Sequence, residues 1–76
     1  MEAFIGKKYR HFKGGEYEVI ALARNEAIPE EIVVIYRALY VSEDFGKNCV
    51  WARKQNYFEE NIEVGGVLVP RFSMIE

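Results

Sequence analysis

Alternating apolar and polar side chains predict short β-strands near the start of the chain. In the segment 8–12, Tyr9 and His11 alternate with their neighbours, as expected of a short strand. Two adjacent glycines at 14–15 follow, and such glycines supply the positive φ that a tight hairpin needs. The segment 16–24 places tyrosine, valine and two alanines on one face, with isoleucine and leucine on the other. This pattern predicts a strand with one apolar face and a partly apolar second face.

A long apolar run in the middle of the chain is ambiguous between strand and helix. Ile32–Ile35 are four consecutive β-branched residues, which favour a pleated strand. Pro29–Glu31 resembles a helix start, and apolar residues at 32, 35, 36 and 39 would form a helical stripe. We expect 32–41 to be a strand, apolar on both faces, that lies inside the sheet or crosses between layers. The residues 25–31 before it are expected to form a connection.

The segments that follow are shorter and more polar. We expect a loop at 42–48, a short strand at 49–53 and a polar stretch at 54–61. The polar stretch has room for one helical or 3₁₀ turn, from which Phe58 would reach the core.

The clearest local signal is a pair of glycines, Gly65 and Gly66, between the alternating apolar residues of 62–69. This arrangement predicts a type I′ hairpin. Pro70 lacks an amide hydrogen, so the last strand is expected to be an edge or to end there. Together these segments predict a mainly β fold, a small antiparallel SH3-like barrel of five or six short strands, as a single domain over residues 1–76.

The charge balance changes the functional picture. Ten basic and twelve acidic side chains give a net charge of −2, which argues against a duplex DNA-binding protein. Four basic residues nevertheless cluster within 7–13, whereas most acidic residues come later, so one basic patch is possible.

The single cysteine and the apolar runs bear on location. One cysteine excludes an internal disulfide and favours a reducing compartment. No stretch approaches the length of a membrane span, and we find no signal peptide. We therefore expect a cytoplasmic protein without a membrane partner.

The residues offer little for catalysis or metal binding. His11 and Cys49 form no recognisable nucleophile–base arrangement, and a structural histidine with a buried cysteine explains both. One histidine and one cysteine are too few ligands for zinc. Adjacent carboxylates such as Glu59 and Glu60 are typical of a solvated surface, and the glycine pairs lack phosphate-loop spacing. We expect no catalytic residues, no metal and no cofactor.

A set of aromatic and cationic residues is the best candidate for a binding face. The wider set is Tyr9, Arg10, His11, Lys13, Tyr36, Arg37, Tyr40, Trp51, Arg53 and Arg71. The candidate ligand-binding residues within it are Tyr9, His11, Tyr36, Arg37, Trp51 and Arg53. Arg53 follows Trp51 by two positions, so both project from the same sheet face. Such residues can stack a base or clamp a carboxylate or phosphate. The alternative is that the rings are core and the arginines pair with glutamates.

Several blocks of the sequence resemble a known bacterial family. In chain order the blocks are YRHFKGGEYEV (9–19), VIYRALY (34–40), WAR (51–53), FE (58–59) and VPRF (69–72). They are similar to the domain of unknown function 1653. The resemblance implies a small, soluble, bacterial, mainly β domain with no assigned activity. The chain departs from the family pattern at Lys54, where a proline is expected, and in the longer loop 42–48.

These observations favour a non-catalytic binding module whose partner is a protein, a peptide or a small ligand. The first alternative is a protein that binds RNA or single-stranded nucleic acid, motivated by the basic patch with Tyr9 and Phe12. The second is a small enzyme with a cleft around His11 and Cys49. Monomer and homodimer both remain open.

Overall fold

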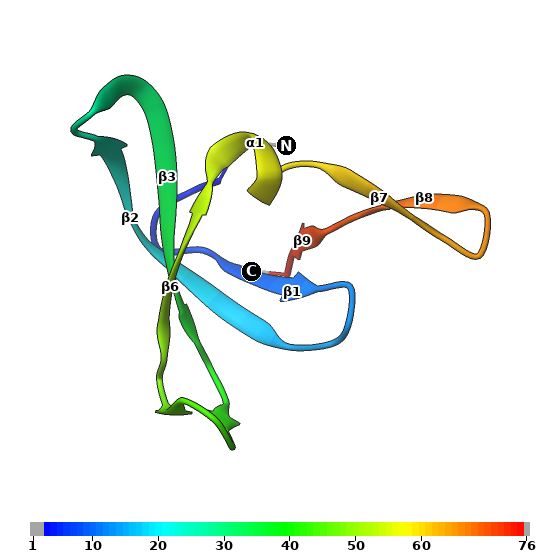
Figure 1. Cartoon of the computed structure of the whole chain (residues 1–76). Helices are drawn as coiled ribbons and strands as arrows, with labels where there is room; N and C mark the ends of the chain where they lie inside the picture. The colour runs from blue at the N-terminus through cyan, green and yellow to red at the C-terminus, as the bar shows by residue number, and fades with distance from the viewer. Residues whose placement is uncertain (1–2, 76) are drawn as a thin grey trace.

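A computed structural model describes residues 3–75 of the chain, and strands dominate them (Figure 1). In chain order the strands are β1 (Lys8–His11), β2 (Glu16–Asn25), β3 (Ile28–Ala38), β4 (Val41–Ser42), β5 (Gly46–Lys47), β6 (Val50–Lys54), β7 (Asn61–Val64), β8 (Val67–Pro70) and β9 (Phe72–Met74). A single helical turn, α1 (Gln55–Phe58), lies between β6 and β7. The mainly β fold class that the sequence predicts is therefore confirmed.

The described strands form one five-stranded sheet and two small hairpins. The large sheet has the order β6-β3-β2-β1-β9, and all of its neighbouring strands are antiparallel. The segment 32–41 is strand rather than helix as far as Ala38, and β3 lies between β2 and β6, as its two apolar faces require. The hairpins β4–β5 and β7–β8 extend away from this sheet (Figure 1).

The start of β3 corrects the expected connection at 25–31. The strand already begins at Ile28, because the turn after β2 is shorter than the sequence suggests. The register jumps from Arg24↔Ile32 to Asn25↔Ile28, so the residues 29–31 bulge out of the ladder. Pro29 therefore needs no amide hydrogen there, and its carbonyl oxygen accepts a hydrogen bond from Arg24 Nη1 at 2.8 Å.

A second bulge corrects the expected faces of β2. The pairs Val19↔Tyr36 and Ala21↔Ile35 leave Ile20 as an extra residue in the strand. Because one extra residue reverses the alternation of side chains, Ala21 does not share the face of Val19. The apolar face that the simple alternation predicts for 16–24 therefore ends at the bulge.

The core lies on one side of the large sheet, which we call the inner face. Its buried apolar residues are Ala3, Tyr9, Val19, Val34, Tyr36, Ala38, Phe58 and Phe72. The predicted helical turn is present, and Phe58 is fully buried, as expected. The ring of Phe58 stacks on that of Phe72 with centroids 4.1 Å apart. Because the two edge strands, β6 and β9, do not pair with each other within the described residues, the sheet is open. The SH3-like barrel stays an expectation with which this topology is compatible.

The last third of the chain combines a confirmed hairpin with a strand that the sequence does not reveal. Gly65 and Gly66 have φ values of 57° and 82°, as a type I′ turn between β7 and β8 requires. Strand β8 ends at Pro70, as expected. Strand β9 is an addition, and it pairs with β1 over Tyr9↔Met74, Arg10↔Ser73 and His11↔Phe72.

The burial of Phe58 generates a prediction about stability. Replacing Phe58 by alanine removes a side chain with no exposed surface, and we expect the free energy of unfolding to fall by about 3–5 kcal/mol. Phe45→Ala is the matched control, because its ring is 61% exposed and we expect its loss to cost less than about 1 kcal/mol. Urea denaturation followed by circular dichroism measures both. Equal losses would contradict the assigned core.

Candidate functional site

Strand register decides which candidate residues share a face. Directly opposite residues of an antiparallel pair project from the same side of the sheet. Trp51 lies opposite buried Tyr36, and Arg53 lies opposite buried Val34. His11 and Arg37 are placed in the same way by the strands next to them. His11 lies opposite the buried ring of Phe72, so it shares the inner face, whereas Arg37 lies opposite Glu18 on the outer face.

Two of the candidate aromatic residues belong to the core. Tyr9 has no exposed surface, and its hydroxyl oxygen accepts a hydrogen bond from the Phe4 amide at 3.0 Å. Tyr36 is 8% exposed and meets Phe58 and Phe72 edge to face. Tyr9 and Tyr36 therefore belong to the core beneath the candidate site.

Arg37 lies on the other face of the sheet, and the Trp51 ring packs against the hairpin residue Phe45. Arg37 forms an ion pair with Glu18 on the outer face. Trp51 is 36% exposed and packs edge to face on Phe45, with ring centroids 5.2 Å apart. The binding role of all six candidate residues stays a prediction.

Two arginines from distant parts of the chain converge on one carboxylate oxygen. Arg71 donates from Nε and Nη2 to Glu60 Oε1 at 3.1 Å and 2.8 Å. Arg53 Nη2 lies 3.5 Å from the same oxygen. Arg53 Nε donates to the carbonyl oxygen of Tyr57 at 3.2 Å, which fixes its direction through the turn α1. We call these three side chains the Arg53–Glu60–Arg71 bridge.

The bridge includes a residue that the sequence reasoning passed over. The sequence predicts a solvated surface carboxylate at Glu60 and places Arg71 only in the wider aromatic and cationic set. A helical turn between Arg53 and Glu60 is the local signal that the chain folds back over this interval. The position of Arg71 depends on the long-range pairing of β9 with β1, which leaves no local signal.

The ring of His11 lies in the positive field of this bridge. The pKa of His11 is lowered mainly by burial. The nearby cations Arg71, Lys13 and Arg53 lower it further. Its Nδ1 accepts a hydrogen bond from the Lys13 amide at 3.2 Å. A neutral imidazole that accepts at Nδ1 carries its hydrogen on Nε2. Within residues 3–75 that Nε2–H group has no hydrogen-bond acceptor.

Three tyrosines complete the inner side of the site. The Tyr17 and Tyr40 hydroxyl oxygens lie 2.6 Å apart, and the Tyr17 ring meets Tyr36 edge to face. Burial and the hydrogen bond with Tyr40 raise the pKa of Tyr17. Burial also raises the pKa of Tyr36, although Arg53 and Arg71 oppose that shift. The Tyr17 and Tyr36 phenols therefore remain protonated at neutral pH and contribute neutral hydroxyl groups.

The described residues assemble cations and donors without a nucleophile and base. His11 forms no hydrogen bond with Cys49 or with a carboxylate of residues 3–75, and the thiol of Cys49 lies 3.9 Å from the Val50 carbonyl oxygen. Over the same residues, no group of three or more metal-ligating side chains occurs. Nor do these residues form a helix with the length and apolar character to cross a membrane. The chemistry that this arrangement supports is recognition of an anion.

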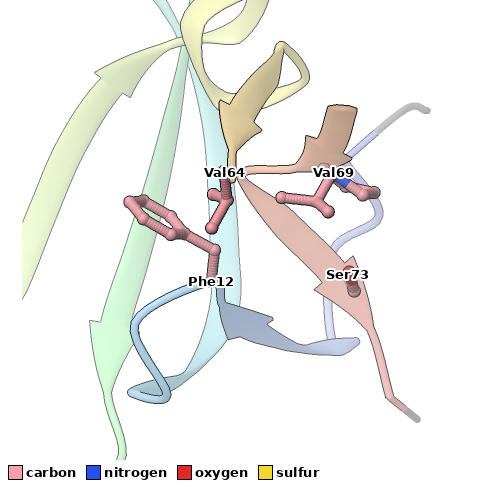
Figure 2. A pocket seen from close by; sticks show the side chains of 5 residues that line it. Phe12, Val64, Val69 and Ser73 are labelled. Atoms are coloured by element: carbon pink, nitrogen blue, oxygen red, sulfur yellow. The ribbon is translucent and has the colours of Figure 1, made fainter. Parts of the chain in front are cut away.

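An open apolar groove lies beside Phe12, whose ring Arg71 of the bridge also approaches. It has a volume of about 420 Å³ and is lined by Phe12, Val64, Val69, Pro70 and Ser73 (Figure 2). The side chains come from the end of β1, the β7–β8 hairpin and β9. None of the six candidate residues lines it.

Cations flank the phenylalanine of this groove. Lys13 Nζ lies 5.7 Å from the centroid of the Phe12 ring, and Arg71 Cζ lies 5.9 Å from it. Both distances fall within the range of a cation–π contact. Arg71 thus belongs to the bridge and also borders the groove.

These features define a small antiparallel β domain with a cationic rim beside an apolar groove. A family model described as a protein of unknown function (DUF1653) matches residues 7–74. The chain is also similar to the crystal structure of a DUF1653 protein from Bordetella bronchiseptica, with a TM-score of 0.79 and 30% identity, over 95% of this chain and 87% of that chain. No curated protein matches it. The chain belongs to the DUF1653 family, as the sequence blocks indicate.

The electrostatics of His11 generate a prediction that one NMR titration tests. The chain contains one histidine, so its ring signals are unambiguous. We expect the pKa of His11 to lie below 6.5 and to move back toward that value in Arg71→Gln, because the variant removes a neighbouring positive charge. Arg37→Gln, on the outer face, removes the same charge and is expected to leave the His11 pKa unchanged.

The same shift fixes the direction of one contribution to stability. Because the folded pKa is lower than the unfolded value of 6.5, the unfolded chain binds more protons near and below that pH. Stability is therefore lost as the pH falls from above 6.5 through the folded pKa. A His11 that titrates at or above 6.5 would contradict the cationic surroundings described here.

Proposed function

We propose that the chain is a non-catalytic binding module that recognises a ligand with an anionic group, and that Arg53, Arg71 and His11 hold this group. The observation that carries the proposal is the convergence of two guanidinium groups on a single carboxylate oxygen, Glu60 Oε1. Glu60 demonstrates that a carboxylate fits between these arginines. The lone cysteine of the chain supports a cytoplasmic location for this module.

The charges of the bridge leave a positive excess. Arg53 and Arg71 share one carboxylate among the described residues, and Lys13 adds a third cation beside His11. The side chains of Arg53 and Glu60 are 33% and 35% exposed, so a ligand reaches them from solvent. An anion at this point offsets charges that Glu60 alone leaves unbalanced.

Hydrogen-bond donors that the protein does not use would orient a bound anion, in addition to the attraction from the positive charges. Each guanidinium group has five N–H donors in a planar fork. Arg53 and Arg71 use their Nε and Nη2 atoms within the described residues, and neither Nη1 has an acceptor there. Together with His11 Nε2–H they offer donors from three side chains. Charge-assisted hydrogen bonds of this kind favour a carboxylate or a phosphate group.

The alternative of a protein that binds single-stranded nucleic acid has less support. It relies on the basic patch at 7–13 with Tyr9 and Phe12, of which Phe12 is exposed but Tyr9 is fully buried and unable to stack on a base. Arg10 forms an ion pair with Glu16 at 2.8 Å, and Lys8 lies opposite Glu18 in the sheet. Cross-strand carboxylates therefore offset the patch, and a continuous basic track for a nucleic-acid backbone does not form there.

Binding of inorganic phosphate and citrate, measured by NMR shift changes, tests the proposal. We expect saturable binding that shifts the His11 ring signals and raises the His11 pKa, because a bound anion offsets the neighbouring cations. Arg53→Gln and Arg71→Gln are each expected to weaken binding about tenfold or more, since each removes a charge-assisted hydrogen bond.

Arg37→Gln is the matched control for these variants. It removes the same charge from the outer face, and we expect it to change the affinity less than about twofold. If all three variants weaken binding equally, the anions respond only to net charge and the assigned site is wrong. Saturable binding that leaves His11 unaffected would also contradict the site.

A further inference from the structure

The β7–β8 hairpin has one wholly apolar face, which is exposed toward the hairpin turn. The register pairs Ile62 with Val69 and Val64 with Val67, so these four side chains project from the same face. Val64 and Val67 are 47% and 61% exposed. Glu63 lies opposite Leu68 on the other face of the hairpin. The hairpin therefore keeps its charge away from the apolar face.

This apolar face forms one wall of the groove beside Phe12. Figure 2 shows Phe12, Val64 and Val69 around a shared space, with Ser73 on β9 at its border. The volume of about 420 Å³ lies within the range of sites for small molecules, about 300–1,000 Å³. An apolar ligand in this space would bury exposed apolar surface, and that burial contributes favourably to the free energy of binding.

The lining of the groove carries no charge, and two cations lie beside the Phe12 ring at its border. Lys13 and Arg71 approach the Phe12 ring, whereas no carboxylate lines the groove. Arg71 also binds Glu60, so the Phe12 ring joins the groove to the Arg53–Glu60–Arg71 bridge. A complementary ligand has a single negative end and an apolar body.

We infer that the groove binds the apolar body of a small monocarboxylic acid whose carboxylate lies at Arg71, with an aliphatic or aromatic chain between Phe12, Val64 and Val69. This inference rests on the proposed anion-binding function and names its ligand class. It commits to a free small acid, because the apolar lining suits a short chain and the nearest cation, Arg71, suits one carboxylate.

A series of straight-chain carboxylates tests this ligand class directly. Acetate, butyrate, hexanoate and octanoate carry the same charged group and differ in apolar length. We expect affinity, measured by NMR titration of the full chain, to rise about two- to fourfold for each added methylene until the groove is filled. Hexanol, which has the body without the charge, is expected to bind at least tenfold more weakly than hexanoate.

Two variants of the same hairpin locate the binding. Val64→Ser places a hydroxyl in the groove and is expected to weaken hexanoate binding about fivefold or more while it leaves acetate binding unchanged. Leu68→Ser is the matched control, because Leu68 is 70% exposed on the opposite face, and we expect it to change neither affinity.

The outcomes separate this inference from the proposed function. If all chain lengths bind equally and Arg71→Gln weakens each of them, anion binding stands and the apolar groove is not part of the site. If Leu68→Ser weakens hexanoate as much as Val64→Ser, or if hexanol matches hexanoate, the inferred ligand class is wrong. If a peptide with a carboxyl-terminal leucine binds at the groove and hexanoate does not, the small acid is excluded. If no carboxylate binds but phosphate does, the inference fails and the proposed function stands, whereas if neither binds, both fail.

Discussion

The stacked rings of Phe58 and Phe72 hold together parts of the molecule that the open sheet leaves apart. Phe58 follows the edge strand β6 through the turn α1, and Phe72 begins the opposite edge strand β9. Their rings are nearly parallel, at 7°, and Tyr9 and Tyr36 meet the Phe58 ring edge to face. Burial of these rings is the main apolar gain available to so small a core. It brings the two edges of the sheet to one point over the inner face.

The candidate site is a consequence of that contact. Arg53 is the second-last residue of β6, just before the turn that carries Phe58, and Arg71 directly precedes Phe72. When the two rings stack, both guanidinium groups are therefore brought to the same side of the core, where Glu60 lies between them. The rim that we assign to anion binding is built from the residues next to the stack, so the apolar core and the charged site share one geometric cause.

Local pattern predicted the elements, whereas long-range register decided the site. Four β-branched residues gave the strand β3, a glycine pair gave the β7–β8 turn, and the turn with a buried Phe58 followed from a polar stretch with one large ring. The bulge at Ile20 and the strand β9 left no local signal, because both depend on which strand lies alongside. The role of Glu60 could not be predicted for the same reason, because its partners Arg53 and Arg71 lie at opposite edges of the sheet.

Register also explains why similar arginines have different surroundings. On the outer face, Lys8 lies opposite Glu18 and Glu18 pairs with Arg37, so successive strands alternate charge and little positive potential remains. At the inner rim, Arg53 and Arg71 share one carboxylate, which leaves an excess of positive charge. This positive charge helps to lower the pKa of His11. Equal residue types thus stabilise the sheet on one face and leave an unbalanced charge on the other. An anion gains most where the fold has left that charge unpaired and exposed, and the apolar groove beside Phe12 meets this point through Arg71.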